Sequence, residues 1–348
     1  MKTTLTTLAL IASVCPAIAA ELTAETKTQT IDSLFASMNK SYVFPDKAKE
    51  AEDAIRARLQ RGEYAEVGDG QAFAKLLTEH LREVCKDAHL RVRYSEQTLP
   101  ARKQNDKPSA EEIAGMRRWE SAMNAAFEKV ERLAGNVGYI KFNGFTSPAG
   151  AERPIRAAMD FVADTDALIF DIRDNGGGEP ATVRLLCSYL FGEKPVHLND
   201  IYDRPTNKTE EFWTLKKVAG RRYLNKDVYV LTSKRSASGA EEFAYNLKNL
   251  KRATIVGEST WGGANPGEMV RLNDHFGAFV PTGRAINPIT KTNWEGTGVE
   301  PDIKVPASDA LKASHLLAIK RLIERTTDAE HKGRLERGLK ELEERYSK

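Results

Sequence analysis

The sequence predicts an α/β protein with a mixed β-sheet, preceded by a small bundle of helices. From residue 135 onward, short apolar stretches with strand character alternate with stretches of helical periodicity. Within the strand expected at 167–172, Leu168, Ile169 and Phe170 form a continuous apolar run, which is typical of a strand covered on both faces. Residues 28–84 show helical periodicity alone. These observations indicate a helical N-terminal part followed by an α/β core.

The helical part is expected at residues 21–95 and contains three short helices. The first shows the spacing of one helix face at Ile31, Leu34, Phe35 and Met38. Proline fits the first turn of a helix, so Pro45 can open the second helix, expected at 46–59. The third has its apolar face at Phe73, Leu76, Leu77, Leu81 and Val84. A strand over residues 90–94 is expected to end this part.

Residues 96–134 are expected to form a polar linker and a helix over 114–133, and residues 135–320 the core. The core strands are expected at 137–142, 167–172, 227–232, 253–257, 268–272 and 277–281. The core helices are expected at 154–163, 180–190 and 240–250. The run 310–346 is helical and highly charged, and residues 321–348 are expected to form a solvated or packing C-terminal helix.

The composition argues against two classes of partner. The 348 residues include 52 Lys and Arg and 49 Asp and Glu, which leaves a net charge of only +3. No basic stripe is interleaved with aromatic residues, so we expect no nucleic acid. No stretch beyond the N-terminus is apolar for long enough to cross a bilayer, so we expect no stable membrane insertion. The sequence leaves the oligomeric state open.

The first 20 residues have the pattern of a secretory signal peptide. Lys2 precedes a short apolar run at 8–14, and small residues near Ala19 provide a cleavage site. A lipoprotein anchor at Cys15 is a weaker alternative, because Val14 stands where a small residue is expected. We therefore expect export to the periplasm or the extracellular space.

Cys85 and Cys187 remain once the signal peptide is removed. Export permits a disulfide between them, but each lies in an apolar helical context that favours two buried free thiols. The six histidines are scattered, and neither Cys-x-x-Cys nor His-x-x-x-His occurs. We therefore expect no metal and no cofactor.

The segment 228–250 is the most informative stretch for function. A strand pattern ends at small polar residues and a helical pattern begins after them, so Ser238 and Gly239 fall at a strand-to-helix turn. Such a turn can present a serine hydroxyl beside the free N–H groups of the helix. A serine at a helix start is also an ordinary N-cap, and these residues alone leave both roles open. Ser236 and, more weakly, Ser233 are chemical rivals.

A second turn contains the consecutive glycines 176–178, directly after the strand expected at 167–172. Glycine permits positive φ and brings backbone N–H groups close to a ligand. The segment matches neither the dinucleotide-binding nor the phosphate-loop pattern. It is either a flexible turn or an oxyanion hole, in which N–H groups stabilise charge on a carbonyl oxygen. Arg173 and Asp174, just before it, are expected to form structural pairs.

Seven short segments occur in the order found in peptidase family S41, the tail-specific or C-terminal-processing proteases. They lie at 42–45, 87–90, 137–140, 171–178, 232–242, 257–267 and 293–302. The chain most resembles the branch that contains the tricorn core and the interphotoreceptor retinoid-binding protein repeats. The resemblance implies a crotonase-like (ClpP-like) α/β core and a nucleophile at Ser238. No segment resembles a PDZ domain, because residues 96–134 are too few and too helical.

One departure from the family pattern bears on the catalytic base. Proteases of the lysine-dependent branch carry a lysine 25 positions after the serine, where this chain has Gly263. The nearest lysines, Lys248 and Lys251, are expected on the solvated side of the preceding helix. A serine without a base is a poor nucleophile. His89 matches the histidine of the tricorn-like branch, and an imidazole titrates in a useful range for this role. A structural histidine is the alternative.

The resemblance places the acidic partner of the triad at Glu295, where it would orient His89 and balance the imidazolium. A carboxylate that only stabilises its own turn is the alternative. The resemblance also implies an oxyanion hole at the N–H groups of Gly176 or Gly177 and of Gly239.

Asn265 and Arg284 are candidates for contact with substrate. The leading hypothesis is an exported serine peptidase that cleaves peptides or unfolded protein segments through a Ser-His-Glu acyl-enzyme mechanism. A non-proteolytic carrier of hydrophobic ligands, as in the retinoid-binding relatives, and an esterase-type acyl hydrolase are the alternatives.

Overall fold

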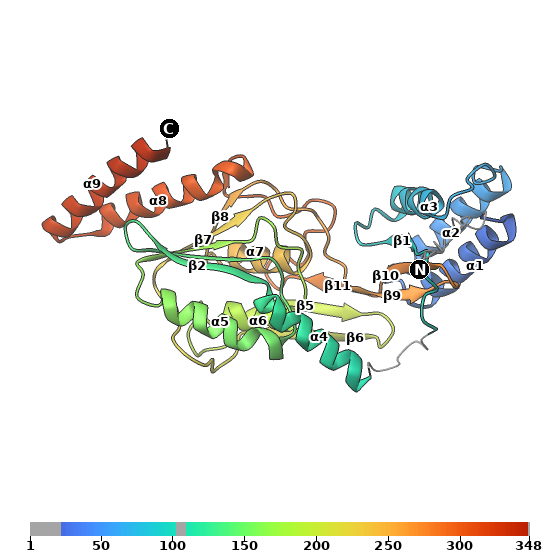
Figure 1. The fold of residues 1–348 in the computed structure, drawn as a ribbon, viewed down its shortest axis with the longest axis horizontal. Coiled ribbons are helices and arrows are strands. Elements are labelled where there is room, and N and C mark those ends of the chain that lie inside the picture. The colour runs from blue at the N-terminus through green and yellow to red at the C-terminus, as the bar shows by residue number, and fades with distance from the viewer. Residues whose placement is uncertain (1–21, 102–108, 347–348) are drawn as a thin grey trace, which may run out of the picture.

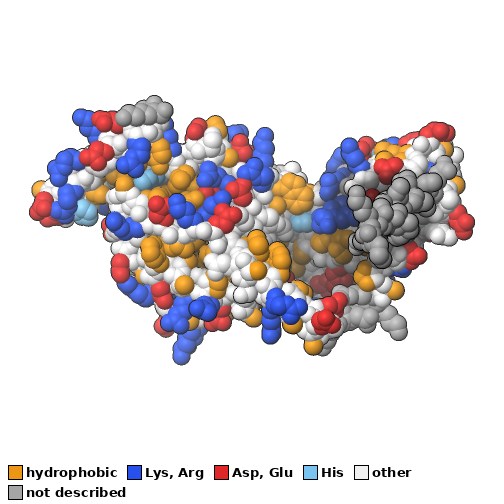
Figure 2. Space-filling view, viewed as in Figure 1, with side chains coloured by type: hydrophobic (Ala, Val, Ile, Leu, Met, Phe, Trp, Pro, Cys, Tyr) orange, Lys and Arg blue, Asp and Glu red, His pale blue; other side chains and the backbone are white. Residues whose placement is uncertain are grey.

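The computed structural model describes residues 22–101 and 109–346, so the expected signal peptide lies outside the described residues. Figure 1 shows an N-terminal part and a larger core, with the two C-terminal helices on the side of the core that faces away from the N-terminal part. Figure 2 shows a hollow in the surface between the N-terminal part and the core. Within the described ranges, no helix is both long and apolar enough to cross a membrane.

The N-terminal part consists of three helices packed on a small antiparallel sheet. The helices are α1 (Ala24–Ser41), α2 (Pro45–Gln60) and α3 (Gly70–Cys85), as the periodicity predicted. The sheet has the order β1-β10-β9, with β1 at Arg91–Tyr94, β9 at Gly267–Arg271 and β10 at Phe276–Pro281. Helices and sheet share one buried cluster, which includes Phe35, Phe73 and Phe276. A hairpin from within the range expected for the core therefore completes the N-terminal part.

The connection to the core differs from its prediction. Helix α4 spans Ala110–Ala122 and starts with a capping box at Ser109. It gives way to the short turn η1 (Asn124–Ala126), where all three residues have positive φ, and then to strand β2 (Phe127–Leu133). The prediction of a helix over 114–133 is thus wrong beyond Ala122, where the helix ends. Apolar residues three apart in β2 imitate helical spacing, but the segment pairs antiparallel with β3.

The core sheet has six strands in the order β12-β8-β7-β4-β3-β2. The inner strands are β3 (Val137–Phe142), β4 (Ala167–Asp171), β7 (Asp227–Thr232) and β8 (Thr254–Gly257), all mutually parallel. The edge strand β12 (Ile303–Lys304) is also parallel, and β2 is antiparallel, so the sheet is mixed as predicted.

Helices cover both faces of this sheet. One face packs on α5 (Pro148–Val162), α6 (Pro180–Ser188) and α7 (Gly239–Asn249), and the other on α8 (Ala310–Arg325) and α9 (Ala329–Tyr346). In β4, Leu168 and Phe170 belong to the first buried cluster and Ile169 to the second, which confirms a strand covered on both faces. The charged C-terminal run is two helices, with the short turn η2 (Ala307–Asp309) before them.

A third sheet was not predicted. It is antiparallel, in the order β11-β5-β6, with β5 at His197–Asp203, β6 at Lys208–Trp213 and β11 at Gly283–Ile286. Cys85 and Cys187 are both buried and free, as the sequence favoured.

Candidate active site

Ser238 stands at the turn from β7 into α7, in a conformation that is rare for a residue with a side chain. Its φ is 55° and its ψ −118°, and Gly239 is the first helical residue after it. Conformations of this kind cost about 1–3 kcal/mol and persist only where the surroundings hold them. A strained strand-to-helix turn is also the arrangement that exposes a nucleophilic serine.

The hydroxyls of the two rival serines are hydrogen-bonded to backbone groups. The Ser236 hydroxyl donates to the carbonyl oxygen of Ile172 at 2.8 Å and accepts from the N–H of Ser233. The Ser233 hydroxyl donates to the carbonyl oxygen of Arg173 at 2.5 Å. Both side chains are buried, whereas Ser238 is partly exposed. Of the three serines, Ser238 is therefore the one placed to meet a substrate.

Glu241 holds the serine turn and a neighbouring loop together. Its carboxylate accepts from the Ser238 N–H (2.8 Å), the Thr260 hydroxyl (2.5 Å), the Gly262 N–H (2.6 Å) and the Gly263 N–H (3.0 Å). Burial raises the pKa of this carboxyl, and these hydrogen bonds act in the opposite direction. Glu241 was not among the residues predicted from the sequence, although a serine followed three residues later by a glutamate is the pattern of a capping box.

The glycine turn packs directly against the serine turn. A Cβ added to Gly177 would lie 2.6 Å from the Gly239 nitrogen and 2.7 Å from the Ser238 Cβ. Gly177 and Gly178 also have positive φ, of 94° and 135°. Both the backbone conformation and the close approach therefore require glycine here.

The free N–H groups near the serine include that of Gly239, as expected, but not those of Gly176 and Gly177. The N–H groups of Gly176 and Gly177 already donate, to a backbone carbonyl at 3.2 Å and to the Asn175 side chain at 2.9 Å. Among the described residues, the N–H groups of Gly178 and Gly239 donate no hydrogen bond, and a Cβ on Gly239 would lie 3.0 Å from the Gly178 nitrogen. Gly178 and Gly239 are thus the better-placed pair for an oxyanion.

Asp87 organises the loop that carries His89. Its Oδ1 accepts from the N–H groups of His89 (3.0 Å) and Leu90 (3.3 Å), and its Oδ2 accepts from the Tyr42 hydroxyl (3.2 Å) and the Asn265 amide (3.0 Å). Residues from three of the segments that matched in the sequence therefore meet at one carboxylate. Burial raises the pKa of Asp87.

The His89 imidazole is enclosed by aromatic rings. Trp261 meets it edge-on at 4.9 Å between ring centroids, and Phe279 lies at 5.7 Å. Its Nδ1 is buried without a hydrogen-bond partner in the described part of the chain. Burial lowers the pKa of His89 to about 4, and the nearby guanidinium groups of Arg91 and Arg82 act in the same direction. The ring is therefore neutral near pH 7 and able to accept a proton.

Glu295 is brought beside His89. Its carboxylate accepts from the N–H groups of Ala88 (2.8 Å) and Ala264 (2.6 Å). Burial and the negative charge of Asp87 raise its pKa to about 7. Asp87, His89 and Glu295 each have one side-chain nitrogen or oxygen atom in this cluster, and these three atoms lie within 4.8 Å of one another. No hydrogen bond joins Glu295 to His89 among the residues described.

Ser238 and His89 come from the core and the N-terminal part, respectively, and the loop around Gly263 lies between them. The Gly263 N–H shares the Glu241 carboxylate with Ser238, while a Cβ on Gly263 would lie 2.8 Å from His89 Cε1. Ser238 and His89 form no direct hydrogen bond within the described ranges. Such contacts often tighten only when substrate is bound.

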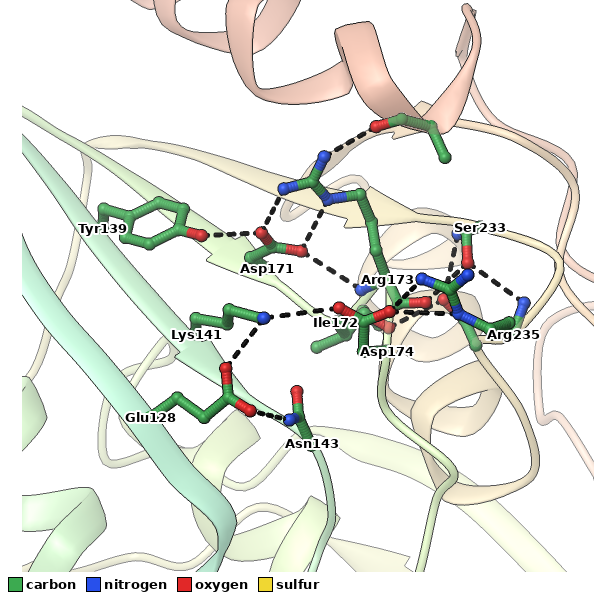
Figure 3. Close-up of polar contacts among 12 residues, drawn as sticks. Glu128, Tyr139, Lys141, Asn143, Asp171, Ile172, Arg173, Asp174, Ser233 and Arg235 are labelled. Carbon is green, nitrogen blue, oxygen red and sulfur yellow. Dashed lines mark hydrogen bonds and ion pairs between the residues drawn. The ribbon is translucent and has the colours of Figure 1, made fainter.

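The charged residues before the glycine turn have structural partners (Figure 3). Arg173 pairs with the buried Asp171 at 2.6 Å. Asp174 pairs with Arg235 and, at 3.3 Å, with Lys141. These contacts tie the turn to the sheet, so Arg173 and Asp174 do form structural pairs, each with a different residue.

The two residues proposed for substrate contact have different surroundings. Asn265 is only 1% exposed and its amide is bonded to Asp87, so it supports the His89 loop. Arg284 is exposed on β11, with its guanidinium 5.8 Å from the centre of the Tyr202 ring. The structure does not join Arg284 to the other candidates by any hydrogen bond or ion pair among the described residues.

Two family models together cover most of the chain. The model for peptidase family S41 matches residues 136–305, and that for the N-terminal domain of peptidase S41 in eukaryotic IRBP matches residues 19–130. The chain belongs to peptidase family S41.

Other S41 proteins are similar in part. Carboxyl-terminal-processing peptidase 2 of Arabidopsis thaliana is 30% identical over 181 residues, which is 49% of this chain and 32% of the relative. Carboxy-terminal processing protease CtpB of Bacillus subtilis is 25% identical over 58% of this chain and 41% of its own length. The chain thus spans less than half the length of these relatives. The crystal structure of mature CPAF, at 14% identity, has the same fold, with a TM-score of 0.57 over 86% of this chain and 97% of that one.

Proposed function

We propose that this S41 chain is a serine peptidase that hydrolyses peptide bonds through an acyl-enzyme. Ser238 would be the nucleophile, His89 the general base and Glu295 the carboxylate that stabilises the protonated base. The observation that carries the proposal is the Ser238 turn. Its strained backbone presents a partly exposed hydroxyl beside two free N–H groups, while the hydroxyls of Ser233 and Ser236 are bonded to carbonyls.

The first half of the reaction transfers the acyl group to the enzyme. The Ser238 oxygen attacks the substrate carbonyl carbon while His89 takes the hydroxyl proton. The N–H groups of Gly178 and Gly239 stabilise the charge on the carbonyl oxygen. His89 then gives its proton to the leaving amine, and the peptide bond breaks.

The second half regenerates the enzyme. A water molecule attacks the ester on Ser238, His89 takes the proton of that water, and the proton returns to the serine oxygen as the acid product leaves. Glu295 stabilises the imidazolium in both halves.

The substrate proposed is a peptide or an unfolded protein segment, cleaved after export of the enzyme. The hollow between the N-terminal part and the core offers room for an extended chain. The names of the processing-peptidase relatives support a protein substrate.

Cleavage of an unfolded protein such as casein tests the proposal. Ser238→Ala and His89→Ala should each lower kcat/KM by about three orders of magnitude or more, with an unchanged circular dichroism spectrum. His275→Ala is a matched control, because His275 lies on the outer loop before β10 and bonds a backbone carbonyl. Cleavage that persists in both variants would contradict the proposal. Hydrolysis of simple esters without cleavage of any peptide would favour an acyl hydrolase.

The alternative of a hydrophobic-ligand carrier rests on the N-terminal match to the IRBP domain. Stoichiometric binding of a retinoid or a fatty acid, without hydrolysis of any peptide or ester, would favour that function.

A further inference from the structure

We propose that Asp87, His89 and Glu295 form a binding site for a divalent transition-metal ion such as Zn²⁺, and that this ion inhibits the enzyme. Binding of the ion depends only on the geometry of the three side chains. Inhibition also rests on the proposed function, because it requires His89 to be the base.

The three side chains supply a suitable set of ligands. Zn²⁺ is bound in proteins by imidazole nitrogens and carboxylate oxygens. Asp87 and His89 are buried, with 1% and 7% of their surfaces exposed, and Glu295 is partly buried. Their ligand atoms lie within 4.8 Å of one another. Zinc bonds of about 2.1 Å place tetrahedral ligands about 3.4 Å apart, so side-chain shifts of roughly 1.4 Å would suffice.

A second observation is that, among the described residues, one imidazole nitrogen of this cluster is unbonded and its two carboxylates have no counter-ion. The buried Nδ1 of His89 has no hydrogen-bond partner in the described part of the chain. The carboxylates of Asp87 and Glu295 lie side by side, and within residues 22–101 and 109–346 no lysine or arginine forms an ion pair with either. A divalent cation would satisfy the imidazole nitrogen and both negative charges at once.

The surroundings hold the ligands in place. Tyr42 and Asn265 donate to Asp87, and the backbone N–H groups of Ala88 and Ala264 donate to Glu295. Hydrogen bonds of this kind orient metal ligands and contribute to affinity.

Two cations act against metal binding. The guanidinium of Arg82 bonds the carbonyl oxygens of Ala88 and Leu90, and that of Arg91 contacts the His89 carbonyl oxygen at 3.3 Å. Arg91→Gln should therefore tighten Zn²⁺ binding, because it removes one of these charges and leaves all three ligand side chains unchanged.

Inhibition follows from the electron pairs of the imidazole. A neutral imidazole has one nitrogen lone pair free to accept a proton. If Zn²⁺ takes that pair, no nitrogen can accept the Ser238 proton, whichever nitrogen binds the ion. The bond is a coordinate one, so no redox partner is needed, and a chelator reverses it.

This site was not predictable from sequence spacing because its ligands come from distant segments. Two of them are two residues apart, and the third lies more than 200 residues further along the chain.

Equilibrium dialysis of the purified chain against ZnCl₂ tests the binding. We expect one Zn²⁺ per chain for the wild type and for Ser238→Ala, which keeps all three ligands. His89→Gln, Glu295→Gln and Asp87→Asn should each weaken binding by at least about tenfold. Asp87 also holds Tyr42 and Asn265, so folding is checked by circular dichroism, and the other two variants suffice if Asp87→Asn does not fold. Absence of saturable binding, or wild-type binding by His89→Gln and Glu295→Gln, would overturn the proposal.

The activity assay tests the inhibition separately. Zn²⁺ at concentrations that saturate the site should abolish cleavage of casein, and EDTA should restore it. Full activity of the zinc-saturated wild type would overturn the inhibitory role. If no preparation cleaves any substrate, the proposed function fails, while the dialysis result still decides whether the metal binds.

Discussion

Gly263 lies directly against the His89 ring, and a Cβ added to Gly263 would come within 2.8 Å of His89 Cε1. By the family resemblance, this is the position at which the lysine-dependent S41 proteases carry a lysine. In this chain, the Trp261 and His89 rings occupy the space into which a side chain at position 263 would extend, and the nearest Trp261 atom would lie 2.3 Å from the added Cβ. The absence of a side chain at Gly263 therefore leaves room for both rings.

Gly263→Ala tests this relationship. The added methyl group would overlap the His89 ring and the Trp261 ring, so one of them has to move. Displacement of a catalytic group by a fraction of an ångström is costly, and we expect kcat/KM to fall by about tenfold or more. Gly192→Ala is the control, because nothing lies within 4 Å of its added Cβ. Wild-type kinetics in Gly263→Ala would show that His89 does not need this space.

Glu241→Gln should damage the site although it replaces none of the proposed catalytic residues. The carboxylate accepts four hydrogen bonds, and a glutamine amide would direct N–H groups at some of the same donors. Leaving buried donors unsatisfied costs about 1–3 kcal/mol each. We expect a lower midpoint of urea unfolding and slower peptide cleavage. Loss of activity without any loss of stability would mean that Glu241 has a direct chemical role.

Glu242, the next residue, should make stability depend on pH. Burial raises its pKa to about 8, although Asn199 and Asn246 partly offset this. Between about pH 4.5 and 8 the unfolded chain loses this proton and the folded chain keeps it. The free energy of unfolding therefore falls as pH rises, by up to about 1.4 kcal/mol per pH unit from this one group.

Urea unfolding at pH 5 and pH 8 measures the effect. Glu242→Gln removes the ionisable group, so the variant should lose less stability than the wild type between the two pH values. Equal losses in both proteins would show that Glu242 is ionised in the folded state.

The two cysteines should be unreactive in the folded protein. Cys85 and Cys187 are buried, and burial raises the pKa of Cys85 to about 11 and that of Cys187 well above its usual value. Little thiolate therefore exists near neutral pH. A thiol reagent followed by mass spectrometry should modify neither residue until urea unfolds the chain. Rapid modification of either one in buffer would contradict the burial.

Much of the fold follows from local patterns in the sequence. Apolar periodicity predicts the helices of the N-terminal part, and continuous apolar runs predict the parallel strands of the core. The failures lie where local patterns compete with distant pairing. Strand β2 has helical spacing but is fixed by its pairing with β3, and the hairpin β9–β10 reads as part of the core but pairs with β1.

The candidate site, too, was predictable from the sequence only in part. The motifs around Ser238, His89 and Glu295 could be recognised one by one, and the structure brings Glu295 next to His89. A glycine N–H group is free only where no acceptor from another part of the chain lies close to it. The Gly176 N–H, for example, is bonded to the carbonyl oxygen of Asn143. The hydrogen bond from Asn265 to Asp87 could not be predicted either, because the two residues are 178 positions apart in the sequence.

The most direct test of the central claim is covalent labelling with a fluorophosphonate probe, which reacts with activated serines. The wild type and Ser236→Ala should be labelled, and mass spectrometry should place the adduct on Ser238. Ser238→Ala should not be labelled, although its circular dichroism spectrum is unchanged. Labelling of Ser238→Ala at the rate of the wild type would contradict the assignment of Ser238 as the nucleophile.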